Sequence, residues 1–318
     1  MHMSNKVKLS ILAGLAILLV IVFLTIDAGG NWDYILPRRG KKLLAIALTG
    51  TAVAFSTVVF QTITNNRILT PSIIGLDSLY MLLQTVIVFL IGGTALTMMS
   101  KNLRFLLAVG MMVLFAGLLY RLLFRKEGRN IYHLLLIGLV FGTFFSSLSS
   151  FMQKLIDPNE FLIIQDKMFA SFNNVNSDIL LLSLVGVLLT GLYFARFTKY
   201  LDVLALGRDH AVNLGISYQY VVKRMLIVVA VLISISTALV GPITFLGLLV
   251  ANVAYQFLNT YRHKTLIFGA SLISFIALVG GQLIVERVFT FSTSLSVIIN
   301  FIGGVYFIYL LLKENKSW

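Results

Sequence analysis

Long apolar runs separated by short polar segments dominate the chain. Most uncharged stretches are close to the roughly 20 residues that an α-helix needs to cross about 30 Å of hydrocarbon. Residues 225–261 are about twice too long for one crossing, and Gly241-Pro242 near their middle favours a break between two helices. The pattern therefore predicts ten transmembrane helices, at about residues 9–26, 43–63, 75–93, 104–121, 131–153, 179–196, 223–240, 243–260, 265–285 and 293–312.

Composition supports an all-α integral membrane protein made of a single transmembrane domain, residues 1–318. Hydrophobic residues make up 58% of the 318 and charged residues only 12%, whereas soluble domains carry about 25% charged residues. The mean hydropathy is +0.95. The first apolar run resembles a signal peptide, but Thr25 to Gly29 contain no convincing small-x-small cleavage site, so an uncleaved helix is predicted.

The net charge of +13 is best explained by membrane topology, and no nucleic acid partner is expected. With ten crossings and the N-terminus in the cytoplasm, most of the 25 lysine and arginine residues fall in cytoplasmic segments, as the positive-inside tendency requires. Both termini are therefore predicted to be cytoplasmic. The outer segment 27–42 is an exception, because it carries Arg38, Arg39, Lys41 and Lys42. Solvation of a helix start, contact with anionic lipid headgroups and docking of a partner are all open explanations for it.

The cytoplasmic loop 197–222 contains apolar residues that a solvated loop does not need. The pattern predicts one or two short helices, with glycine at the turns between them. The apolar positions are Leu204, Leu206, Ala211 and Leu214, and the glycines are Gly207 and Gly215. The loop either docks this apolar face on a partner or folds back on its own helices.

Polar stripes mark two of the predicted helices. In the helix 131–153, polar residues recur at helical spacing and share one face: Ser146, Ser149, Ser150 and Gln153. In the helix 43–63, a similar stripe ends at Gln61. Such residues either line a wet translocation path or hydrogen-bond two packed helices. The polar segment from Gln61 to Gly75 interrupts the apolar pattern, and irregular backbone at membrane depth needs shelter by protein or a water-filled cavity.

Catalytic chemistry is not indicated. The chain has no cysteine, no phosphate-binding or metalloprotease motif, and four scattered histidines without metal-ligand spacing, so no catalytic or metal residues are predicted. Only Asp77 among the acids falls within predicted membrane helix, whereas ion-driven carriers place ionisable groups deep in the bundle. A stand-alone secondary transporter or channel, or an intramembrane enzyme, is therefore less favoured than a permease driven by another subunit.

Four segments resemble signatures of the FecCD-type permeases of type II ABC importers, which carry iron–siderophores, haem or cobalamin. Gln61 to Gly75 is similar to Q-x4-N-P-L-A-x-P-x-x-L-G, and Leu204 to Gly215 to L-x-L-G-x-x-x-A-x-x-L-G. Gly241 to Leu248 matches G-P-I-x-F-x-G-L, and Gly303 to Leu311 resembles the last-helix signature. The chain departs from the family at Asn252, Gln282 and Val305, which fits a branch for catecholate or petrobactin-like siderophores in Gram-positive bacteria.

The resemblance implies a multi-pass permease of the bacterial cytoplasmic membrane that imports an iron–siderophore complex. Its expected partners are an ABC ATPase, an identical or homologous permease, an extracellular substrate-binding lipoprotein and membrane lipid. The chain itself is then no enzyme and holds no cofactor: ATP and magnesium belong to the ATPase, and iron enters only within the siderophore. The expected site residues are Leu204, Leu206, Gly207, Arg208, Ala211, Leu214 and Gly215 for ATPase coupling; Arg38, Arg39 and Arg287 for binding-protein docking; and Gln61, Asn66, Ser146, Ser149, Ser150 and Gln153 for the path.

Overall fold

The computed structural model describes residues 4–27, 29–93, 98–123, 131–173 and 175–314. Its regular secondary structure in these ranges is entirely helical, with no strand. The predicted stretches correspond to α1 (Asn5–Thr25), α2 (Trp32–Thr64), α3 (Leu76–Ile91), α5 (Lys101–Leu123), α6 (Ile131–Gln153), α8 (Ser177–Ala195), α11 (Tyr218–Val240), α12 (Leu246–Leu258), α13 (His263–Arg287) and α14 (Leu295–Glu314). Within the described ranges, eight of them are long and apolar enough to cross a membrane, while α3 and α12 are shorter. The all-α membrane fold is therefore confirmed.

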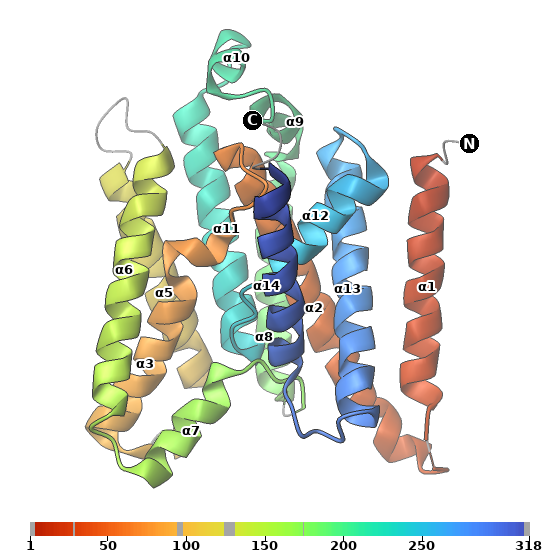
Figure 1. Cartoon of the computed structure of the whole chain (residues 1–318), viewed down its shortest axis with the longest axis vertical. Helices are drawn as coiled ribbons and strands as arrows, with labels where there is room; N and C mark the ends of the chain where they lie inside the picture. The colour runs from red at the N-terminus through yellow and green to blue at the C-terminus, as the bar shows by residue number, and fades with distance from the viewer. Residues whose placement is uncertain (1–3, 28, 94–97, 124–130, 174, 315–318) are drawn as a thin grey trace.

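The two buried helices α2 and α11 form the centre of the bundle. Both are mostly covered by other helices, whereas α1, α8 and α14 expose most of their apolar side chains. An exposed apolar helix surface of this length is expected where the surrounding solvent is lipid. Figure 1 shows α2 and α11 in the middle of the molecule and α1 at its edge.

Each central helix is followed by a backbone break and a short apolar helix. After α2, Asn65 adopts a left-handed conformation, the chain forms the 3-10 helix η1 (Pro71–Ile74), and α3 begins. After α11, Gly241 has a φ of +102°, and α12 begins at Leu246. The predicted break at Gly241-Pro242 is thus confirmed, and positive φ explains why glycine stands there.

The N-terminal end of α2 differs from the prediction. Residues 27–42 were expected to form an outer loop, but α2 begins at Trp32 and includes Pro37. At 1.5 Å per residue its 33 residues span about 50 Å, more than the hydrocarbon thickness of about 30 Å. The charges that suggested a loop lie on helix turns outside the predicted apolar stretch.

Short helices mark the two ends of the molecule. α9 (Thr198–Leu204) and α10 (Arg208–Asn213) lie at the end where α1 begins and α14 ends, and α7 (Pro158–Met168) lies at the opposite end (Figure 1). We call these the α9–α10 end and the α7 end.

Candidate functional site

The break after α2 is held by side-chain amides. Gln61 Nε2 donates to the carbonyl oxygen of Arg67 at 2.6 Å, and Asn252 Nδ2 of α12 donates to the same oxygen at 2.9 Å. Asn66 Oδ1 accepts from Ile68 N at 2.8 Å, a local turn contact. Gln61 and Asn66, predicted for the translocation path, therefore stabilise irregular backbone in this structure. Asn252 was not predicted as a site residue, although its departure from the family signature marked the position.

The polar stripe of α6 forms a seam with α3. Ser146 Oγ donates to Ser78 Oγ at 3.0 Å, and the Ser149 and Thr85 hydroxyls are 2.8 Å apart. Gln153 Nε2 lies 3.0 Å from Thr85 Oγ1 and 2.9 Å from Ser149 Oγ. Buried Ser149 and partly buried Gln153 thus take part in helix packing, one of the two alternatives, whereas Ser146 is exposed. Ser150 is exposed and lies outside the seam.

Glycines allow close backbone contact between α6 and the segment η1–Gly75, which directly precedes α3. A Cβ placed on Gly75 would lie 2.8 Å from Gly142 Cα, and one on Gly138 would lie 2.8 Å from Ile74 Cα. Gly75 also has a φ of +88°. Any side chain at Gly75 or Gly138 would push η1 and α6 apart, so this close approach requires glycine.

The loop predicted to couple to an ATPase is divided between an inner and an outer set of residues. Leu204 and Ala211 are buried against the rest of the chain, and Gly207 and Gly215 have positive φ angles. In contrast, Leu206 is 58% exposed and Leu214 is 63% exposed. Arg208 begins α10 and is exposed. The loop thus folds back through one set of apolar residues and presents the other outward.

A histidine connects this loop to the bundle. Buried His263 at the start of α13 contacts Asp202 Oδ1 of α9 through its Nδ1 at 2.6 Å and Thr62 Oγ1 of α2 through its Nε2 at 2.9 Å. The His263 backbone N–H donates to the same Asp202 oxygen at 2.9 Å. Burial acts to raise the pKa of Asp202, but the two His263 hydrogen bonds and the neighbouring His263 and Arg262 charges outweigh it and lower the pKa below its usual value.

Two of the three predicted docking arginines are engaged within the chain. Arg39 Nη1 donates to the carbonyl oxygens of Phe23, Leu24 and Ile26 at 2.8–2.9 Å. Arg287 pairs with Asp27 and donates to the Ile26 carbonyl at 3.2 Å. The last carbonyls of a helix lack intrahelical donors and attract cations, so both arginines stabilise the end of α1. Arg38 differs, since its Nη1 makes only a long hydrogen bond of 3.4 Å, to the Tyr34 hydroxyl one turn earlier, among the described residues.

A buried ion pair lies beside these arginines. Lys42 Nζ of α2 is 2.7 Å from Glu286 Oε1 of α13, and both side chains are largely buried. Gln282 Nε2 donates to the same Glu286 oxygen at 2.7 Å and to Asn173 Oδ1 at 3.1 Å. Gln282, noted above as a departure from the family pattern, thus ties Asn173 to α13.

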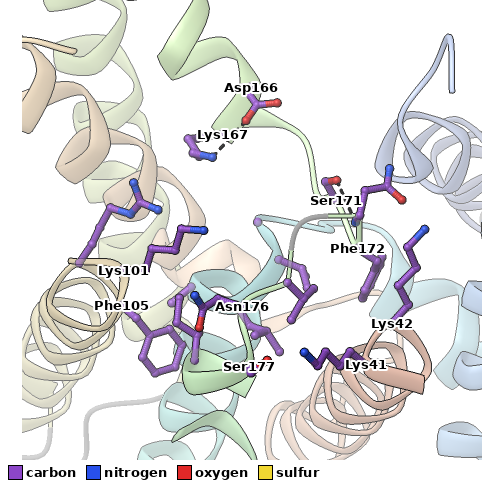
Figure 2. A pocket seen from close by; sticks show the side chains of 18 of the residues that line it. Lys41, Lys42, Lys101, Phe105, Asp166, Lys167, Ser171, Phe172, Asn176 and Ser177 are labelled. Atoms are coloured by element: carbon purple, nitrogen blue, oxygen red, sulfur yellow. Dashed lines mark hydrogen bonds and ion pairs between the residues drawn. The ribbon is translucent and has the colours of Figure 1, made fainter. Parts of the chain in front are cut away.

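A cavity of about 810 Å³ opens at the α7 end between α2, α3, α5, α7, α8 and α11. Figure 2 shows Lys41, Lys101 and Lys167, from α2, α5 and α7, arranged around it. Arg38, Lys42 and Arg104 also line it, so the cavity collects much of the outer positive charge. The sequence indicated the cluster at residues 38–42 but gave no sign that Lys101 and Lys167 would join it.

Comparisons with known proteins agree on the kind of protein to which this chain is similar. Residues 6–313 match the FecCD transport family. The chain is 67% identical over 316 residues to the Bacillus subtilis petrobactin import system permease protein YclO, covering 99% of this chain and 100% of that protein. It is 37% identical to the Bacillus anthracis petrobactin import system permease protein FatC, covering 88% and 79%. The fold matches a chain of a metal-chelate type ABC transporter in an inward-facing conformation, with a TM-score of 0.85, 22% identity, and coverage of 98% and 100%.

The capping role of Arg39 predicts a stability difference between neighbouring arginines. Arg39→Ala removes three hydrogen bonds to the end of α1 and should lower the free energy of unfolding by about 1–3 kcal/mol. Arg38→Ala, which removes the same charge one residue earlier, should change it by less than about 0.5 kcal/mol. Denaturation of the detergent-solubilised protein measures both, and equal effects of the two substitutions would contradict the assigned cap.

The Asp202–His263 contact predicts a pH-dependent contribution to stability. Because the folded-state pKa of Asp202 is lowered, its contribution is present above the unfolded value of about 3.9 and is lost as the pH falls through the folded value. Asp202→Ala should therefore cost about 1 kcal/mol at pH 7, with discounting for its half-exposed side chain, and much less near pH 3. Thermal unfolding at both pH values tests this, and a pH-independent difference would argue against it.

The α3–α6 seam predicts protection of a thiol placed inside it. The chain lacks cysteine, so single cysteines can be introduced without a background. Ser149→Cys should react at least about tenfold more slowly with a charged, water-soluble thiol reagent than Lys154→Cys just beyond the same helix, because Ser149 is 3% exposed. Equal reaction rates in the folded protein, with full labelling of both after denaturation, would instead support a wet path along this face.

Proposed function

Because the chain belongs to the FecCD transport family, we propose that it imports ferric siderophores of the petrobactin type as the membrane-spanning permease of an ABC importer. The observation that carries the proposal is the 67% identity, over essentially both full lengths, to a petrobactin import permease. The chain is a multi-pass helical membrane protein, and the ten-helix bundle supplies a scaffold for a translocation path rather than a catalytic centre.

The proposed partners bind at opposite ends of the molecule. An ATPase docks at the α9–α10 end, where exposed Leu206, Val212 and Leu214 give a small apolar surface beside the charged Arg208. Apolar side chains of this kind insert into a hydrophobic groove of a partner. An extracellular binding protein docks at the α7 end, where Arg38 remains the candidate contact. A second permease, identical or homologous, completes the path.

This assignment places the α9–α10 end and both termini in the cytoplasm. The bias of lysine and arginine toward that end supports the orientation, although the predicted cytoplasmic residues Arg125, Lys126, Arg129 and Lys316 lie outside the described residues. In the proposal the chain holds no cofactor. ATP and magnesium act in the ATPase, and iron passes through only as part of the siderophore.

Growth and uptake in cells test the function. A strain that lacks the gene for this chain should lose uptake of ferric petrobactin and recover it when the gene is restored, while uptake of an unrelated nutrient stays constant. Deleting the partner ATPase should abolish uptake equally. Uptake that persists without the ATPase would favour the alternative of a stand-alone secondary transporter.

Docking through Leu214 predicts a strong effect of one charge. Leu214→Asp places a carboxylate in the proposed apolar contact, where an unpaired buried charge costs about 3–5 kcal/mol, and should reduce ATPase association and uptake more than tenfold. Asn213→Asp adds the same charge at the neighbouring exposed, polar position and should retain most of the activity. Co-purification of the ATPase and uptake measure the two variants, and an unimpaired Leu214→Asp protein would rule out this contact.

A further inference from the structure

A small second cavity lies where the two backbone breaks meet inside the bundle. Its volume is about 10 Å³, which leaves room for about one water-sized sphere. It is lined by residues of α2, α3, α11 and α12, together with η1 and the residues that follow Gly241. Figure 1 shows that α3 begins between the two ends of the molecule. The cavity therefore lies within the bundle and away from both ends.

Oxygen atoms dominate the polar part of this cavity's wall. Among the described residues, six hydroxyl side chains and the carboxyl group of Asp77 line it, and the other lining residues are apolar. The hydroxyl residues are Thr57, Thr70, Ser72, Ser236, Thr237 and Thr244. Neutral and anionic oxygens are the ligands of hard cations, and no described lysine, arginine or histidine lines the cavity to compete for them.

Asp77 has no counterion in this position. It stands in the first turn of α3 and accepts hydrogen bonds from Thr237 Oγ1 at 3.0 Å and from the Ser72 side chain. It forms no salt bridge with any described residue, and no other described residue that lines the cavity is charged. Hydroxyl groups solvate a carboxylate but do not neutralise it. A carboxyl group inside a membrane protein therefore requires either a proton or a cation.

The hydroxyl group of Thr57 favours the cation. Thr62 and Thr64 in the same helix donate to carbonyl oxygens one turn earlier at 2.8 Å, which is a common contact of a helical threonine. The Thr57 hydroxyl is buried and has no partner, and among the partnerless buried side chains of the described ranges only Thr57 lines this cavity. A proton on Asp77 would leave the Thr57 oxygen unsatisfied, whereas a cation in the cavity would be coordinated by both residues.

Charge and size both favour a small monovalent ion. One carboxylate balances one positive charge, so a divalent cation would leave an excess charge inside the bundle. The space is kept small by close packing of α12 against α2, because a Cβ on Gly247 would collide with Thr57 Oγ1. The cavity thus has room for a single small ion and cannot hold a large one.

We propose that this cavity is a sodium site in which the Asp77 carboxylate and the Thr57 hydroxyl supply oxygen ligands. The ion neutralises Asp77, satisfies Thr57, and links the start of α3 to the central helix α2. Breaks in transmembrane helices are places where transport proteins bind sodium, because unwound backbone there exposes further oxygens. The ion is part of the fold, and ATP remains the energy source of the proposed transport. The inference does not rest on the proposed function.

Binding of radioactive sodium to the full chain in phosphatidylcholine nanodiscs tests the site. With choline as the replacement cation at constant ionic strength, we expect saturable binding of about one Na⁺ per chain. Asp77→Asn keeps the shape but removes the charge and should weaken binding at least about tenfold. Thr57→Val removes only the hydroxyl group and should weaken binding about threefold.

The matched control is Asp178→Asn. Asp178 is the second residue of α8, as Asp77 is of α3, but it is exposed and does not line the cavity. This variant should bind sodium as the wild-type chain does. Sodium should also raise the midpoint of thermal unfolding of the wild-type chain and of Asp178→Asn, but not that of Asp77→Asn.

Two results would overturn the site. Absence of saturable sodium binding to the wild-type chain would assign a proton to Asp77 instead, and equal binding by the wild-type chain and Asp77→Asn would show that the ion binds elsewhere. If Asp77→Asn does not fold, Thr57→Val decides, since undiminished binding by that variant contradicts the proposed ligands. The measurement involves neither an ATPase nor a siderophore, so its failure would leave the proposed function standing.

Discussion

Backbone N–H and C=O groups at membrane depth have to be hydrogen-bonded by the protein itself, and the placement of the polar side chains follows from this constraint. The chain leaves helical geometry after both central helices, and after α2 the Arg67 carbonyl oxygen is satisfied by two amides, from Gln61 and Asn252. At the end of α1, Arg39 supplies donors for three carbonyls. Residues that look functional because they are polar in an apolar sequence are thus used first to keep the backbone satisfied.

The remaining polar groups divide the molecule into two chemically different ends. At the α9–α10 end, the Asp202–His263–Thr62 contacts fix α9 against α13 and α2, and leave Leu206 and Leu214 outward. One buried histidine therefore connects α9 directly to the central helix α2. At the α7 end, cationic side chains surround a cavity that α2 and α11 also line. The central helices thus lie between the surface proposed for ATPase docking and the cavity at the opposite end.

The sequence predicted the helices well because length and hydropathy determine membrane crossing, and Gly241-Pro242 marked the break after α11. It placed the start of α2 about three turns late, since the charged run from Arg38 to Lys42 resembles a loop even though it lies within the helix. Roles that depend on distant contacts were not predictable. Arg39 and Arg287 meet the end of α1 only in the fold, and Ser149 meets Thr85 from a separate helix. Lone residues such as His263 and Asn252 carry no spacing pattern, so their contacts were found only in the structure.

The proposed function requires that this chain move a ferric siderophore only as part of an ATP-driven complex. Liposomes containing the chain with its proposed second permease and ATPase, supplied with the loaded binding protein, allow accumulation of radioactive iron to be measured directly. We expect accumulation that requires ATP inside the liposomes and every component of the complex. Accumulation by the chain alone, driven by an ion gradient without ATP, would contradict it.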